Sequence, residues 1–176
     1  MTVKTAEYEI APARWPEDTE QARALLTNYG EYLASSPSGA AGVCIPGYEA
    51  ELRGLQGKYV GKEADLLLAR VKGGGAGEGA GCVAITRRVL TDGTDAAEMK
   101  RLWVEPRFRG HGIGRGLVGS AIDWARAHEC SAMVLDTVNE AMPEAAELYR
   151  SLGFEEITRF NENPVPGVRF YQLMLR

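Results

Sequence analysis

The sequence predicts one mixed α/β domain of the α+β kind across residues 1–176, and two observations lead to this prediction. First, residues 98–119 read EMKRLWVEPRFRGHGIGRGLVG, a strand pattern that ends near Pro106 and passes through a glycine-rich turn into a helix pattern. Second, a strand, two helices and three hairpin-joined strands lead up to this turn, and a helix, a strand, a helix and two strands follow it. No internal repeat or linker interrupts this order, so we expect one core.

The first third of the chain predicts one strand and two helices. Residues 6–10 have a strand pattern, and Pro16 with the acidic residues after it is typical of a helix start. Residues 35–47 are small and turn-forming, so we expect a loop there, and a second helix over residues 48–59 is interrupted by two glycines. The first helix carries apolar residues at helical spacing, namely Ala22, Leu25, Leu26, Tyr29 and Leu33.

Three strands should follow, the last of them leading into the glycine turn. Residues 65–71 form a nearly continuous apolar run, as in a strand covered on both faces. Residues 73–81, GGGAGEGAG, predict a flexible hairpin loop before the strand at residues 82–90. Residues 91–93 then turn the chain into the central strand.

The second half predicts two helices and three strands. A buried strand is expected at residues 132–136 and a helix at residues 141–152, which Gly153 ends. Two last strands, at residues 154–160 and 168–175, are joined by a loop. The helix after the glycine turn has an amphipathic stripe made of Ile113, Leu117, Ala121, Trp124 and Ala125.

Composition excludes several classes of protein. A net charge of −4 argues against general nucleic-acid binding, which needs a basic face. Three cysteines and two histidines share no metal-ligand spacing, so we expect no metal site. The amino terminus lacks an apolar signal core, and no run approaches the ~20 apolar residues of a membrane helix. We therefore expect a cytoplasmic protein that does not act at a membrane.

The glycine turn indicates an anion site. Gly110, Gly112, Gly114 and Gly116 occur at every second position, and Arg109 stands at the entrance. Each glycine inside a helix costs roughly 1 kcal/mol relative to alanine, so a purely structural helix start would not need four of them. Bare backbone N–H groups at the positive end of a helix suit a phosphate or pyrophosphate.

Three sequence blocks resemble the GCN5-related N-acetyltransferase (GNAT) superfamily. The first is the Arg-x-x-Gly-x-Gly signature formed by Arg109, Gly112 and Gly114. The second is the segment from Asp136 to Asn139 at the end of a strand, and the third is residues 148–154, LYRSLGF. The strong match covers residues 98–176, whereas the first half agrees only in the order of its elements.

The resemblance implies a fold and a co-substrate. It implies a mixed, mostly antiparallel sheet of six to seven strands, with a splay between the fourth and fifth strands that admits the pantetheine arm of acetyl-CoA. It also implies that acetyl-CoA is the only cofactor, used as a co-substrate without a metal. The residues that would bind the coenzyme are Leu102, Val104, Arg109, Gly110, His111, Gly112, Gly114, Arg115 and Asn139. For His111, a solvated side chain without a phosphate contact is the alternative.

Acetyl transfer needs a proton donor for the leaving thiolate and a hydrogen-bond donor for the developing oxyanion. The resemblance implies Tyr149 as the acid, and a phenol with an ordinary pKa of about 10 can donate at neutral pH. The alternative is a core tyrosine on an amphipathic helix. By the same analogy, the backbone N–H of Val104 would be the oxyanion donor.

Glu98 is the candidate base that would take the proton of the amine. Strand alternation predicts that Glu98, Lys100, Leu102 and Val104 share one face. The alternative for Glu98 is a strand-edge acid paired with Lys100 or Arg101.

Several functions remain open at this point. A small-molecule amine is the expected acceptor in a direct, ternary-complex transfer, with protein or peptide acetylation and a non-catalytic acyl-CoA-binding module as alternatives. Gly114-x-Gly116-x-x-Gly119 also matches a dinucleotide fingerprint, but these glycines lie too far past the strand for an NAD(P) oxidoreductase. A homodimer is a further expectation.

Overall fold

The computed structural model describes residues 7–36, 47–73 and 78–175. The strands of these residues are β1 (Tyr8–Pro12), β2 (Ala64–Val71), β3 (Glu78–Val89), β4 (Asp95–Val104), β5 (Ala132–Val138), β6 (Glu155–Ile157) and β7 (Val168–Met174). The helices are α1 (Thr19–Ala34), α3 (Tyr48–Arg53), α4 (Leu55–Lys58), α5 (Ile113–Ala127) and α6 (Pro143–Ser151), with a short 3₁₀ helix, η1 (Pro106–Phe108). None of the helices in these ranges combines the length and the apolar character that crossing a bilayer requires.

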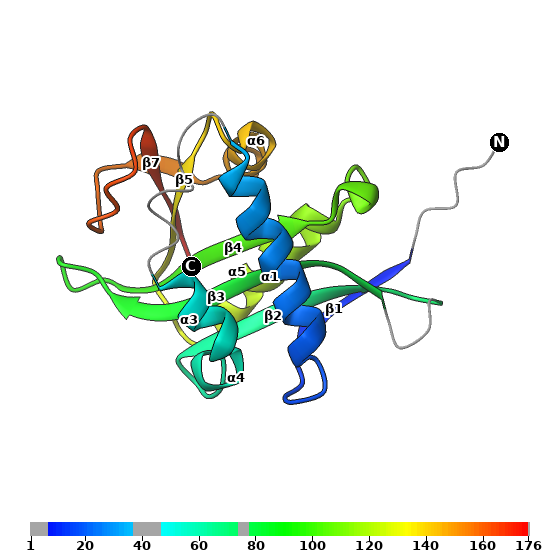
Figure 1. Ribbon diagram of the computed structural model, residues 1–176. Helices are drawn as coiled ribbons and strands as arrows, with labels where there is room; N and C mark the ends of the chain where they lie inside the picture. The colour runs from blue at the N-terminus through cyan, green and yellow to red at the C-terminus, as the bar shows by residue number, and fades with distance from the viewer. Residues whose placement is uncertain (1–6, 37–46, 74–77, 176) are drawn as a thin grey trace.

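The described strands form one seven-stranded sheet in the order β1-β2-β3-β4-β5-β7-β6 (Figure 1). All neighbours pair antiparallel except β4 and β5, which are parallel. The sheet is therefore mixed and mostly antiparallel, which confirms the predicted fold class.

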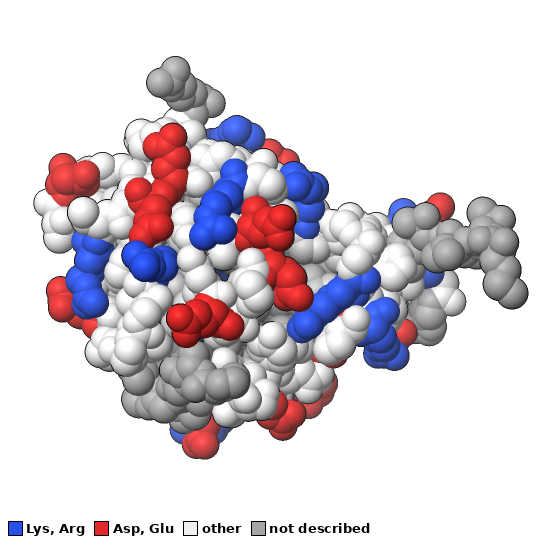
Figure 2. Space-filling view, turned by 90° about the horizontal axis from the view of Figure 1, so that it is seen from above, with Lys and Arg blue, Asp and Glu red and all other residues white. Residues whose placement is uncertain are grey.

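On the face shown in Figure 2, acidic and basic side chains are interspersed, and no basic patch forms there.

Helices cover both faces of the sheet. In Figure 1, α1, α3 and α4 lie in front of it and α5 lies behind. The front core joins Leu25 and Leu26 of α1 to Trp103 of β4, whereas the rear core joins Leu117 of α5 to Tyr149 of α6. The predicted amphipathic stripes are thus the faces that pack on the sheet.

The prediction of a flexible loop over residues 73–81 is wrong for residues 78–81, which belong to a strand. Strand β3 already begins at Glu78, and residues 74–77 lie outside the described part of the chain. A Cβ at Gly81 would lie 2.5 Å from the backbone oxygen of Trp103. Close packing of neighbouring backbones, rather than flexibility, is therefore the reason for glycine at this position.

Strands β4 and β5 pair over only three positions, from Ala96 opposite Ala132 to Glu98 opposite Val134. Beyond this point β5 continues to Val138 but pairs only with β7. The two strands therefore diverge, which confirms the predicted splay between the fourth and fifth strands.

A β-bulge interrupts β4 at Arg101, which has a φ of 59° and lies opposite a register shift in β3. Met99 and Leu102 consequently both pack in the rear core, although three positions separate them. The extra residue reverses the alternation of side chains. Glu98 and Lys100 therefore lie on the opposite face from Leu102 and Val104, and the prediction of a shared face is wrong.

Candidate functional site

The glycine-rich turn connects the end of β4 to the start of α5. After η1, the chain passes through Gly110 and Gly112, whose φ angles of 77° and 80° are in the left-handed region. Gly112 is the residue that precedes the first turn of α5. Glycine adopts these angles without the steric cost that other residues meet, so the turn depends on both positions.

The backbone N–H groups of the turn form a cradle without internal partners. Within the described chain, Gly116 is the first residue after Arg109 whose N–H has a backbone partner, the oxygen of Gly112 at 2.9 Å. The six N–H groups from Gly110 to Arg115, which we call the amide cradle, bond to no described residue. Because they lie at the positive end of α5, the cradle suits a phosphate or pyrophosphate.

Side chains from distant segments hold the cradle in place. The Nε of Arg109 donates a hydrogen bond to the oxygen of Val104 at 3.0 Å, and its guanidinium lies over the rings of Trp103 and Tyr32. The hydroxyl of Tyr8 donates to the oxygen of Gly112 at 3.2 Å. Arg109 therefore shapes the turn by fixing it to the strand end.

Two hollows meet at the splay. The first, of about 310 Å³ and here called the groove, borders the amide cradle. The second, of about 400 Å³ and here called the cleft, lies where β4 and β5 diverge. The groove is lined by Leu102, Val104, Gly110, Gly112, Met142 and Leu148, among others. The cleft is lined by Arg88, Lys100, Leu102, Asp136, Met142 and Tyr149, among others. Because Leu102 and Met142 border both, the two hollows are adjacent.

The backbone of β4 presents groups without a strand partner to the splay, although the oxygen of Val104 accepts the hydrogen bond from Arg109. The N–H of Glu105 bonds to the oxygen of Ala80 on β3 at 2.9 Å. Successive backbone groups of a strand point to opposite edges, so those of Val104 and Leu102 point toward β5. Since the ladder with β5 ends at Glu98, the N–H of Val104 faces the gap between the strands.

Tyr149 of α6 borders the cleft. Its ring is buried and packs near Phe154 and Tyr171, with ring centroids at 5.8 and 6.4 Å. Burial raises the pKa of the Tyr149 phenol well above its ordinary value, and the charge of Asp136 adds to this effect. The hydroxyl therefore keeps its proton at neutral pH while it borders the cleft.

Glu98 is buried and forms ion pairs with two cationic side chains. Its Oε2 accepts a hydrogen bond from Arg88 at 2.6 Å, and the Nζ of Lys100 lies 3.1 Å from its Oε1. Arg88 and Lys100 border the cleft above it. The predicted pairing of Glu98 with Lys100 is confirmed, and Arg88 joins the pair. Arg101 pairs instead with Glu51 of α3.

Three residues predicted to contact the coenzyme have side chains directed elsewhere. The Nδ1 of His111 lies 2.9 Å from the oxygen of Arg109, and Arg115 donates to Ser151 at 2.8 Å. The side-chain amide of Asn139 donates to the hydroxyl of Tyr171 at 3.0 Å. None of the three side chains borders the groove, so their contacts with coenzyme remain predictions that this geometry does not favour.

Sequence reasoning missed the supports of the site. Tyr8 lies 104 positions before Gly112, and no local pattern relates the two. Arg88 of β3 bonds to Glu98, ten positions further along the chain, and no local pattern relates these two either. Gly114, Gly116 and Gly119 all lie inside α5, so the dinucleotide fingerprint has no strand-to-helix turn to occupy.

Comparison with known proteins identifies the chain. The profile of the acetyltransferase (GNAT) family matches residues 41–154. A relative in Schizosaccharomyces pombe, an uncharacterized N-acetyltransferase, is 30% identical over 171 residues, which are 97% of each chain. The chain belongs to the GNAT family. As a member, it is an acetyl-CoA-dependent N-acetyltransferase.

Proteins similar to this chain have names and bound molecules that point to different substrates. Human N-acetylaspartate synthetase is 37% identical over 75 residues, which are 42% of this chain and only 24% of that protein. A GNAT acetyltransferase from Staphylococcus aureus matches with a TM-score of 0.74 at 18% identity, over 97% of this chain and 100% of that one. The NatC complex bound to Gag peptide and CoA (TM-score 0.67, 22% identity, 97% and 99% covered) shares the fold. So does spermidine N-acetyltransferase from Vibrio cholerae with CoA and spermine (TM-score 0.66, 17% identity, 95% of each chain).

Proposed function

We propose that this GNAT protein acetylates the primary amine of a small molecule, by direct transfer while both substrates are bound. The observation that carries the proposal is the adjacency of the amide cradle and the splayed cleft that holds Tyr149. Acetyl-CoA, when bound, supplies the acetyl group as a thioester together with a thiol leaving group. The residues of the chain bind it, orient it and supply protons.

The amide cradle fits the coenzyme because six N–H groups without partners can bind its pyrophosphate. The apolar groove that leads away from the cradle fits the pantetheine arm, and Leu102 and Val104 offer backbone groups along it. The N–H of Val104 can donate a hydrogen bond to an acyl oxygen that lies between the strands.

Tyr149 is the proton donor in this proposal. As the C–N bond to the neutral amine forms and the C–S bond breaks, the phenol gives its proton to the departing thiolate, and the proton that the nitrogen loses returns to the phenolate through solvent. Its raised pKa keeps the phenol protonated, and its place in the cleft lining lets the hydroxyl reach a sulfur that enters from the groove. Glu98 acts in this proposal as a paired acid and not as the base, because both of its carboxylate oxygens already contact cations. It holds Arg88 and Lys100 at the border of the cleft.

A covalent enzyme intermediate is not part of the proposal. Cys82 is fully buried, and burial raises the pKa of its thiol well above the ordinary value. A thiol without thiolate character is a poor nucleophile. A further cysteine, Cys44, lies outside the described residues.

The shape of the cleft supports a small acceptor. A volume of about 400 Å³ is within the range of small-molecule sites. The loop between β6 and β7 borders the cleft with Asn161, Asn163 and Val165 and is bonded to Asp136 of β5. A peptide substrate would need this border to open.

The test combines a binding assay with a turnover assay. Trp103 borders the groove, so its fluorescence should change when acetyl-CoA is added to the purified protein. Release of free CoA is then measured with a panel of small amines and amino-terminal peptides. Binding together with release by a small amine supports the proposal. Absence of binding, or release by peptides alone, overturns it.

A further inference from the structure

We infer that the acceptor carries an anionic group, such as a carboxylate, as well as its reactive amine. It would lie across the cleft, with the amine toward Asp136 of β5 and the anionic group toward Lys100 and Arg88. This inference rests on the proposed function and names the class of its substrate. It follows from register, charge and hydrogen bonding at the two walls of the cleft.

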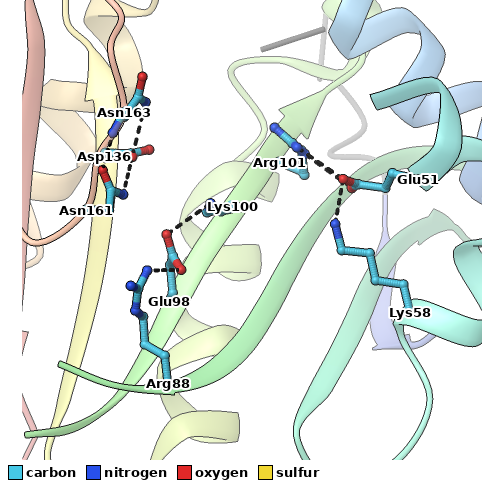
Figure 3. A network of polar contacts seen from close by, with 9 residues as sticks. All are labelled: Glu51, Lys58, Arg88, Glu98, Lys100, Arg101, Asp136, Asn161 and Asn163. Atoms are coloured by element: carbon cyan, nitrogen blue, oxygen red, sulfur yellow. Dashed lines mark hydrogen bonds and ion pairs between the residues drawn. The ribbon is translucent and has the colours of Figure 1, made fainter. Parts of the chain in front are cut away.

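The register places opposite charges across the splay. The last paired residues of β4 and β5 are Glu98 and Val134. Two positions further on, a continued ladder would bring Lys100 opposite Asp136 with both side chains on the same face. The strands have diverged there, and both residues border the cleft between them. Figure 3 shows Asp136 on one side of this gap and the Glu98 cluster on the other.

Among the described residues, the β4 wall carries more positive than negative charge. Arg88 and Lys100 share the single carboxylate of Glu98, which leaves one cation in excess. Arg101 also borders the cleft, but its guanidinium is directed toward α3, where two of its nitrogens bond to Glu51 at 3.3 and 3.1 Å (Figure 3). A carboxylate of the acceptor would complete the charge balance at this wall.

The β5 wall is negative and fixed. The Oδ2 of Asp136 accepts hydrogen bonds from Asn161 at 2.6 Å and from Asn163 at 3.2 Å, while its Oδ1 bonds to no described residue. The two asparagines are themselves held by turns, since their Oδ1 atoms accept the N–H groups of Asn163 and Val165. Glu162 borders the same side of the cleft. An ammonium group is the fitting partner for this wall.

The position of Tyr149 determines which end of the acceptor reacts. The Tyr149 ring lies 6.4 Å from the ring of Tyr171 on β7, and Tyr171 pairs with Leu135, the residue before Asp136 on β5, so the proton donor lies on the side of the negative wall. An amine held by Asp136 is therefore at the reacting end, and the anionic group is at the far end. A polyamine would place a second cation against Arg88 and Lys100, which is unfavourable.

The experiment compares matched acceptors on the purified protein. CoA release is measured with amino acids that carry a single carboxylate, such as L-alanine and β-alanine, with the carboxamide of each, and with spermidine. We expect kcat/KM to be at least about tenfold higher for an amino acid than for its amide, since a charge-assisted hydrogen bond is lost.

Two variants test whether Lys100 is the residue that recognises the anionic group. Lys100→Met removes the excess charge while Arg88 still pairs with Glu98, so KM for the amino acid should rise about tenfold or more. KM for acetyl-CoA and for the amide should not change. Lys58→Met is the matched control, because Lys58 also contacts a buried glutamate, Glu51 at 2.6 Å, but lies outside the cleft lining. It should leave every KM unchanged.

The outcomes separate the two claims. Turnover with amides or spermidine that equals turnover with amino acids overturns the inference and leaves the proposed function standing. An equal effect of Lys100→Met on amino acids and amides also overturns it. No CoA release with any acceptor overturns the proposed function, and the inference with it.

Discussion

Glu51 on α3 neutralises the residue at the β-bulge of β4. Its buried carboxylate receives hydrogen bonds from Arg101, from Lys58 at 2.6 Å and from Tyr59 at 2.7 Å. Burial alone would raise the pKa of Glu51, but these bonds and the charge of Arg101 outweigh it and lower the pKa to about 2, from an ordinary 4.5. The difference corresponds to about 3 kcal/mol of stability.

The sign of the pH dependence follows from the lowered pKa. Because the folded protein binds the proton of Glu51 less readily than the unfolded chain does, this stabilisation is fully present above pH 4.5. It is lost as the pH falls from about 4.5 toward about 2. A Glu51→Gln variant lacks the charge at every pH and leaves Arg101 buried without a counterion.

We therefore expect Glu51→Gln to lower the free energy of unfolding by about 3 kcal/mol at pH 7, measured by urea unfolding. The difference from the unmodified protein should shrink at pH 3. Lys58→Met is the control: this lysine is 46% exposed, so its loss should cost less than about 1 kcal/mol. Equal stability of the two proteins at pH 7, or a difference that does not change with pH, would refute the assigned charge state of Glu51.

Three further variants test the site. Tyr149→Phe should lower kcat by roughly 100-fold or more with unchanged affinity for acetyl-CoA by calorimetry, and unchanged kcat would remove Tyr149 from the mechanism. Gly112→Ala strains a residue at φ 80° by about 1–3 kcal/mol and should weaken acetyl-CoA binding, whereas Gly119→Ala, where a Cβ meets nothing, should bind normally; equal binding by both would contradict the amide cradle. Tyr8→Phe removes the bond to Gly112 and should weaken acetyl-CoA binding several-fold, and unaltered affinity would show that the turn holds without it.

Most of the fold could be predicted because its elements are locally encoded. The amphipathic stripes of α1 and α5 and the break between α3 and α4 at Gly54 follow from spacing and from glycine. The strand character of residues 78–81 could not be predicted. Their glycines are required by Gln21, Leu25 and the backbone of β4, which are distant in sequence.

The backbone geometry of the candidate site could be predicted from the sequence, whereas the directions of its side chains could not. The amide cradle depends on glycine spacing, which the sequence displays directly. The directions of His111, Arg115 and Asn139 depend on partners such as Ser151 and Tyr171, so a motif match could not give them. Their roles, like that of Glu98, stay predictions.

The bulge at Arg101 explains why one strand can serve both substrates. In a regular strand, Lys100 and Leu102 would share a face, and charge would enter the apolar groove. With one residue inserted, Leu102 and Val104 turn to the groove while Glu98 and Lys100 stay on the other face. The left-handed φ of Arg101 is unfavourable for a non-glycine residue, and the buried pair with Glu51 is one of the contacts that hold its side chain, together with the ring of Tyr48 at 4.9 Å. Loss of this pair should therefore disturb the coenzyme groove and the acceptor cleft together.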